Sequence, residues 1–76
     1  MKELVKQLAC ALVDNRDDVH VNEVEGSQAN ILELRVRKEE TGKIIGRSGK
    51  IADAFRTLLN CAGKKVQKKY ILQILD

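Results

Sequence analysis

The sequence predicts an α+β fold, in which three helices cover one face of a three-stranded sheet. Apolar residues recur at helical spacing in two long segments, and they alternate with polar residues in three short ones. With a further short helix, the elements follow one another in the order α-β-β-α-α-β. Because a sheet with one apolar face must bury that face, we expect all three helices to pack on it. We expect the 76 residues to form a single domain, residues 1–76, without a large enclosed pocket.

The helices are predicted from the spacing of apolar residues. The first is expected over residues 2–13, where three leucines lie one turn apart: Leu4, Leu8 and Leu12. A short helix is expected over residues 39–45, and a long one over residues 50–62 with Phe55 on its buried face. Gly63 is placed to end the long helix, because glycine commonly follows a helix C-terminus.

Three segments alternate apolar and polar residues, as strands that are buried on one face do. The first, over residues 19–24, loses its period before Val24, which predicts a β-bulge. A turn over residues 26–30 joins it to a second strand over residues 32–36, so we expect a hairpin. The third strand is expected over residues 66–74, with four side chains on one face: Val66, Tyr70, Leu72 and Ile74.

Charge is distributed unevenly along the chain. The net charge is +3, but residues 1–34 hold three basic and seven acidic side chains, whereas residues 35–76 hold eleven basic and four acidic ones. A basic half on a globular domain indicates a polyanionic partner. A solvated surface carries such charges too, so this indication needs a second, geometric signal.

Cys10 and Cys61 are the only cysteines, and neither belongs to a CxxC pair or a ligand cluster. Both lie among apolar residues at helical spacing, so we expect two buried, reduced thiols rather than a metal site. A disulfide between them would require a proximity that the sequence does not establish. No secretory signal opens the chain and no apolar run has membrane-spanning length, so we expect a cytoplasmic protein with no membrane partner.

The segment 41–51 supplies the geometric signal, because it contains three glycines, three basic residues and no acid. Gly46 and Gly49 lack Cβ atoms, so a phosphate can approach their backbone closely and they can adopt positive φ angles. The helix that begins near residue 50 directs free N–H groups and the positive end of its dipole at the same place. These features predict an anion-binding cradle of six residues: Lys43, Gly46, Arg47, Ser48, Gly49 and Lys50.

Residues 44–51, IIGRSGKI, resemble the signature of the KH domain family, in which an isoleucine and a glycine precede two variable residues and a second glycine. The element order is similar to that of type II, prokaryotic KH domains, which implies a mixed sheet. The resemblance covers essentially the whole chain. A KH domain of this length also resembles the KhpA group of small bacterial RNA-binding proteins.

The resemblance implies that single-stranded RNA, about four nucleotides of it, lies between the GxxG loop and an aliphatic groove. By position, residues 46–49 would contact the sugar-phosphate backbone. Ile45 and Ala52 would line the groove, and Arg35 and Arg37 would flank it on the strand side. The resemblance also implies a global, chaperone-like RNA-binding regulator that forms homodimers or pairs with a larger KH protein of the Jag (KhpB) type, without a cofactor or small-molecule substrate.

Two other functions stay open on the sequence. A helix-turn-helix would present polar side chains of the long helix to duplex DNA: Asp53, Arg56, Thr57 and Asn60. The basic residues concentrate in the loop rather than along that helix, which favours the KH interpretation. The chain could instead be a protein-interaction (dimerisation) module with little RNA affinity, since Ile71 and Leu75 fall on the strand face opposite Tyr70 and mark a partner surface where that face is open.

An enzyme is not expected. His20 is the only histidine, and no nucleophile lies beside it in the sequence. The loop also lacks the features of a nucleotide-binding P-loop, because Ile51 stands where Ser or Thr is required and no strand leads into the loop.

Overall fold

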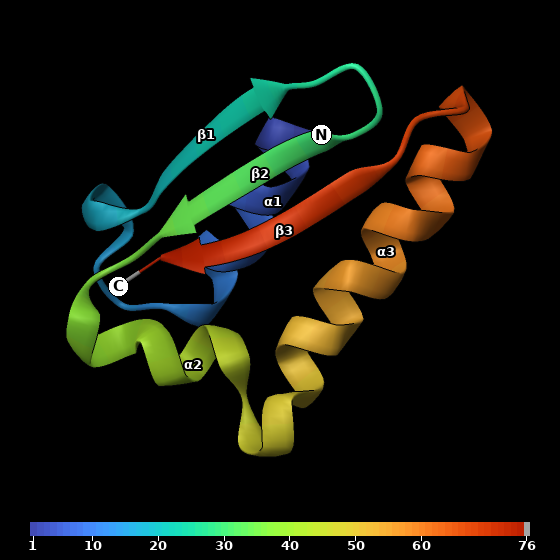
Figure 1. Cartoon of the computed structure of the whole chain (residues 1–76). Helices are drawn as coiled ribbons and strands as arrows, with labels where there is room; N and C mark the ends of the chain where they lie inside the picture. Colours follow the sequence, from blue (N-terminus) through green and yellow to red (C-terminus); the bar gives the residue numbers. More distant parts are fainter. Residues whose placement is uncertain (76) are drawn as a thin grey trace.

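A computed structural model describes residues 1–75, and its elements follow the predicted order (Figure 1). The helices are α1 (Lys2–Leu12), α2 (Thr41–Ile45) and α3 (Lys50–Val66). The strands are β1 (His20–Glu25), β2 (Asn30–Arg35) and β3 (Tyr70–Leu75). Three single turns of 3-10 helix connect them: Arg16–Asp18, Lys38–Glu40 and Arg47–Gly49. The prediction of an α+β fold with one three-stranded mixed sheet is confirmed.

The sheet has the order β1-β2-β3, with β1 antiparallel and β3 parallel to the central strand. The parallel pair requires a crossover, which α2 and α3 provide. Pairing between β1 and β2 is continuous, and Val24 lies opposite Ile31. The expected bulge at Val24 is therefore wrong: this side chain alternates onto the open face of the sheet and is 45% exposed.

The core lies between the sheet and the helices. Its fully buried side chains come from every layer and include Val5 of α1, Leu32 and Leu34 of β2, Ile44 of α2 and Leu59 of α3. In Figure 1, α1 lies behind the sheet and α3 runs alongside β3. This arrangement covers one sheet face and leaves the other open.

The end of α3 differs from the prediction. The helix continues past Gly63 to Val66, and Gln67 ends it in the left-handed conformation with φ at 57°. Gly63 is buried inside the helix, where an added Cβ would overlap the carbonyl oxygen of Lys68 and lie 3.2 Å from the ring of Tyr70. Gly63 therefore permits close packing of the returning chain, and Val66 belongs to the helix rather than to β3.

The thiols are only partly as expected. Cys10 is half-buried, whereas Cys61 is exposed on the outer side of α3, so the prediction of two buried thiols is wrong for Cys61. Within residues 1–75, no three His, Cys, Asp or Glu side chains are grouped as a metal site. No helix of the described chain is long and apolar enough to cross a membrane.

Candidate nucleic-acid interface

The loop between α2 and α3 has three residues with positive φ: Gly46 at 78°, Ser48 at 56° and Gly49 at 75°. Gly46, with ψ at 174°, occupies a region that is essentially restricted to glycine. An added Cβ there would also lie 2.6 Å from a side-chain carbon of Ile51, whereas one at Gly49 would meet open space. The backbone conformation therefore requires the first glycine more strictly than the second.

The backbone of this loop is arranged to receive an anion. Gly49 is left-handed and Lys50, with φ −66° and ψ −35°, is right-handed. Such pairs turn successive N–H groups to one side. The N–H of Gly49 donates to the carbonyl of Gly46 over 3.2 Å. The N–H of Lys50 donates to the carbonyl of Arg47, so these two bonds hold the loop in shape. No side chain caps α3, a helix of 17 residues, so the N–H groups that follow Lys50 in its first turn and the positive end of its dipole face the loop.

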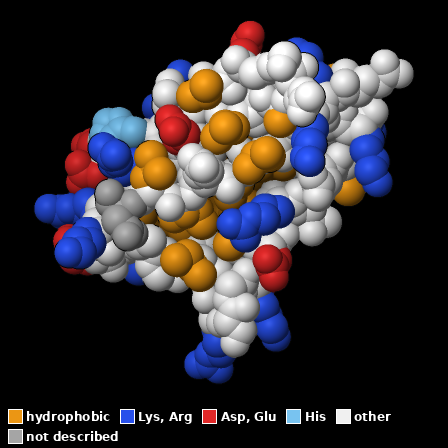
Figure 2. Space-filling model, viewed as in Figure 1, with side chains coloured by type: hydrophobic (Ala, Val, Ile, Leu, Met, Phe, Trp, Pro, Cys, Tyr) orange, Lys and Arg blue, Asp and Glu red, His pale blue; other side chains and the backbone are white. Residues whose placement is uncertain are grey.

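Two of the three predicted basic residues project freely from the loop. Arg47 and Lys50 are exposed, as is Ser48, and the ion pairs of residues 1–75 include neither Arg47 nor Lys50. Figure 2 shows basic side chains at the tip below the sheet, where the loop lies in Figure 1. The loop thus combines full positive charge, a hydroxyl and backbone donors.

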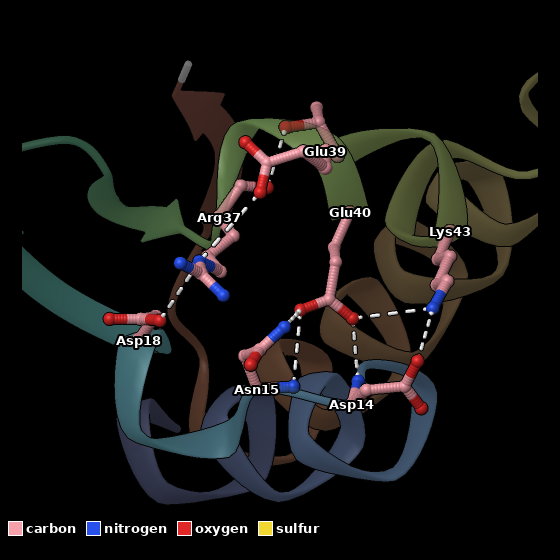
Figure 3. Close-up of polar contacts among 8 residues, drawn as sticks. Asp14, Asn15, Asp18, Arg37, Glu39, Glu40 and Lys43 are labelled. Carbon is pink, nitrogen blue, oxygen red and sulfur yellow. Dashed lines mark hydrogen bonds and ion pairs between the residues drawn. The ribbon is translucent and has the colours of Figure 1, made fainter.

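Lys43 has a different setting. Its Nζ lies 2.9 Å from Oδ2 of Asp14 and 3.3 Å from Oε2 of Glu40 (Figure 3). The hydrogen bond to Asp14 and the one to Glu40 raise the pKa of Lys43. Its charge is therefore engaged by Asp14, just after α1, and by Glu40 at the start of α2. The structure does not bring this charge into the loop with Arg47 and Lys50.

Glu40 organises the approach to the loop. Its buried carboxylate accepts hydrogen bonds from Asp14 N (2.5 Å), Asn15 N (3.1 Å) and Asn15 Nδ2 (2.7 Å) (Figure 3). The N–H of Asp14 and the amide of Asn15 lower the pKa of Glu40 to about 2. This carboxylate ties the end of α1 to the start of α2, which leads directly into the loop. The sequence identified Glu40 only as a helix-start acid, because its partners lie far away along the chain.

A family model described as KhpA/KhpB, KH domain, matches residues 2–74. The chain belongs to this family. It is 52% identical over 75 residues to the RNA-binding protein KhpA of Caldanaerobacter subterraneus subsp. tengcongensis, and 51% identical over 75 residues to that of Clostridium perfringens. Each match covers 99% of this chain and 100% of the relative. The RNA-binding protein KhpA of Aquifex aeolicus is 46% identical over 76 residues, which cover 100% of this chain and 96% of that protein.

No solved structure gives a significant match. Membership in the KhpA/KhpB family agrees with the α+β architecture, whose mixed sheet and three helices are consistent with a type II KH fold.

The two apolar groove residues expected of a KH domain lie on either side of the loop. Ile45, at the end of α2, is 40% exposed, whereas Ala52, in the first turn of α3, is 4% exposed. An apolar surface under nucleotide bases must be accessible, and Ile45 meets this condition better than Ala52. Figure 2 shows hydrophobic side chains gathered between the sheet and α3, next to the basic tip.

The two arginines expected on the strand side of the KH groove are not placed with the loop. Arg35 ends β2 on the open sheet face, opposite His20 and Leu75, beside an open hollow of about 310 Å³. Nε of Arg37 lies 3.3 Å from Oδ2 of Asp18, in the turn before β1 (Figure 3). The structure therefore groups Arg47, Ser48 and Lys50, and it separates both strand-side arginines from them.

Proposed function

We propose that this chain binds single-stranded RNA by holding its sugar-phosphate backbone at the GxxG loop, residues 46–49. The observation that carries the proposal is the conformation of this loop, which has three positive-φ residues at the start of a 17-residue helix. The exposed side chains of Arg47 and Lys50 add positive charge at the same place. The matching relatives are named RNA-binding proteins, which supports the same function.

Base recognition in this proposal comes from aliphatic contact rather than from stacking. The chain has one phenylalanine and one tyrosine; Phe55 is buried in the core, and Tyr70 is partly buried against it. A platform of exposed aromatic rings is therefore missing, and backbone contacts position RNA without reading its sequence. We propose a single KH domain without enzymatic activity, in which the exposed Ile45 supplies most of the apolar contact and the buried Ala52 little of it.

The test replaces two loop residues by aspartate, as Arg47→Asp with Ser48→Asp. We expect at least a tenfold loss of affinity for single-stranded RNA and a smaller dependence on salt, because each lost phosphate contact removes about 0.7 from the slope. The matched control is Arg16→Asp with Gln7→Asp. It changes the net charge by the same amount as the loop variant, at exposed positions that lie outside the loop. Unchanged affinity and slope in the loop variant would contradict the proposal.

Titration with duplex DNA at the same salt distinguishes the helix-turn-helix alternative. Asp53, Arg56 and Thr57 are all exposed on α3, as that alternative requires. Tighter binding of duplex DNA than of single-stranded RNA, lost on substitution of Arg56 and Thr57, would support the helix-turn-helix. We expect the opposite preference, because Arg47 and Lys50 in the loop form no ion pair within residues 1–75. In contrast, Arg56, the one basic residue of the face that would read DNA, lies 3.7 Å from Asp53.

A second candidate function, protein interaction, is favoured by the open sheet face. The register places Val24, Ile31 and Ile71 side by side in one row across all three strands, and Val24 and Ile71 are 45% and 40% exposed. Such a row is suited to a partner, either a second copy or a larger KH protein of the Jag type. Light scattering of the chain alone and mixed with such a partner tests this. Val24→Lys with Ile71→Lys should dissociate any complex. If the wild-type chain is a monomer both alone and in the presence of the partner, the interaction is excluded.

A further inference from the structure

The highest density of positive charge outside the loop lies at the other end of α3. Residues 54–75 contain five basic side chains and no acidic one. Four of the five lie within six residues and are all exposed; we call them the lysine cluster: Lys64, Lys65, Lys68 and Lys69. The ion pairs found in residues 1–75 involve Arg37, Lys43 and Arg56, but none of the lysine cluster.

The backbone holds the lysine cluster in one place. Lys68 N–H donates to the carbonyl of Gly63 over 2.9 Å, and the N–H of Asn30 donates to the carbonyl of Lys69 over 2.8 Å. Between the two lysine pairs, the left-handed Gln67 reverses the chain. Because the turn is fixed to both α3 and β2, four ammonium groups are concentrated around one rigid turn.

The lysine cluster borders a polar hollow of about 190 Å³ between this turn and the β1–β2 hairpin loop. Its lining combines ammonium, amide and hydroxyl groups from both loops, among them Ser27, Gln28, Gln67, Lys68 and Lys69. All of these side chains can donate hydrogen bonds to phosphate oxygens. An anion in the hollow would therefore meet donors from two directions.

Favourable interaction with the dipole of α3 explains the presence of only two of the four lysines in the cluster. Lys64 and Lys65 lie in the last turn, where cations interact favourably with the carbonyl end of a helix. Lys68 and Lys69 follow Gln67, after the helix has ended, and helix stability does not require them. Their positive charge therefore needs a different explanation.

The lysine cluster and the GxxG loop occupy the two ends of the same helix. A helix of 17 residues spans about 25 Å, which is longer than a loop that clamps four nucleotides can cover. Figure 2 shows basic side chains at the loop tip and again along the α3 side of the molecule. Arg56, between the two ends, is half exposed, and its pairing with Asp53 is long at 3.7 Å. Positive charge is thus available along one edge.

We propose that the lysine cluster is a second contact for RNA backbone phosphates, engaged by strands that extend beyond the nucleotides at the GxxG loop. This inference rests on the proposed RNA-binding function. The lysines contribute charge without reading bases, so they lengthen the binding site and leave base preference unchanged.

The test compares two double variants on RNAs of two lengths. Lys68→Gln with Lys69→Gln removes two charges from the lysine cluster, and Lys2→Gln with Lys6→Gln removes two from exposed positions on α1. Oligouridines of about 6 and about 18 nucleotides are titrated across salt, because only the longer one spans α3 after filling the loop. With the long RNA, the cluster variant should lose about tenfold in affinity and about 1.4 in salt slope, and the α1 variant should retain both. With the short RNA, both should bind like the wild type.

The outcomes separate this inference from the proposed function. A cluster variant that binds the long RNA like the wild type overturns the inference, and the proposed function stands if Arg47→Asp with Ser48→Asp still weakens both RNAs. Equal losses in the cluster and α1 variants also overturn it, because they report net charge alone. A loop variant that binds both RNAs normally defeats the proposed function itself. The cluster variant is also mixed with phosphatidylserine vesicles. If it loses binding to the vesicles that the wild type binds, and its affinity for RNA is unchanged, the lysines contact an anionic lipid surface and the inference is overturned.

Discussion

The turns at the two ends of α3 both depend on glycine, but for opposite reasons. At the N-terminal turn, Gly49 has φ at 75° and an added Cβ would meet nothing within 4 Å. At the C-terminal turn, Gly63 lies within the regular helix, and an added Cβ would overlap the carbonyl of Lys68. At Gly49 the first turn, the open turn, has space for a side chain and requires only a left-handed backbone angle, whereas at Gly63 the second turn, the filled turn, has no space for a side chain.

This difference separates binding from folding. The open turn leaves the side chains of Arg47 and Lys50 accessible, and it requires left-handed backbone at Ser48. The filled turn brings β3 against α3 and hydrogen-bonds its own donors, as in the contact from Lys68 N to Gly63 O. We therefore expect substitutions at the filled turn to change stability, and substitutions at the open turn to change RNA binding as well.

The largest expected effect is that of Gly63→Ala. Overlap with the backbone at Lys68 outweighs the better helix propensity of alanine, and we expect a loss of about 3 kcal/mol in the free energy of unfolding. Urea denaturation measures it. Gly42→Ala is the matched control, because Gly42 lies in α2 with nothing within 4 Å of its Cβ position, and this variant should be as stable as the wild type or more so. Equal stability of the two variants would refute the packing role of Gly63.

The next effect distinguishes the two glycines of the loop. Gly46→Ala forces alanine into a region essentially restricted to glycine and against Ile51, and should destabilise by about 2 kcal/mol. Gly49→Ala, in left-handed backbone with open space, should destabilise by about 1 kcal/mol. Thermal unfolding ranks the two, and RNA titration of each folded variant shows whether either angle is needed for binding. The reverse order of stability would contradict the conformations described for the loop.

A third effect develops only in acid. The pKa of Glu40 is about 2 in the folded protein, below its ordinary value of 4.5, so the unfolded chain binds more protons between these values. The stabilisation by this carboxylate is therefore complete above about pH 4.5 and is lost as the pH falls through about 2.

Glu40→Gln should lower the free energy of unfolding at neutral pH. It should also reduce the loss of stability between about pH 4.5 and about pH 2, which we call the acid limb, as measured by urea denaturation at a series of pH values. Glu39→Gln is the control, since the Glu39 carboxylate is 74% exposed and makes only a 3.7 Å ion pair with Arg37. If both variants keep the wild-type acid limb, Glu40 does not anchor α1 to α2.

The smallest expected effect concerns two basic residues that the sequence grouped together. Arg47→Gln should reduce the salt slope of RNA binding by about 0.7, because its guanidinium is unpaired at the open turn. Lys43→Gln should leave the slope unchanged, because Asp14 and Glu40 already hold that ammonium group. Equal changes for the two variants would place Lys43 in the RNA site after all.

The predictions from sequence succeeded where a pattern repeats inside one element and failed where a distant neighbour decides. The spacing of leucines defined α1 to within one residue, and alternation identified the buried face of β2. Gly63, Val24 and Cys61 were assigned wrongly, as a helix stop, a bulge and a buried thiol. In each case the outcome depends on which surface packs against the residue, and local periodicity carries no information about that surface.

The sequence by itself determined the order of the elements and the chemistry of the GxxG loop, because glycines, basic residues and a helix start are contiguous there. Only the tertiary structure decided which of the nearby charges are available. It pairs Lys43 with Asp14, 29 residues away, and leaves Arg47 unpaired at the loop. It also gathers the lysine cluster and the hairpin loop around one hollow. The physical reason is that the availability of a charge depends on its neighbours in space, which folding brings together from distant parts of the chain.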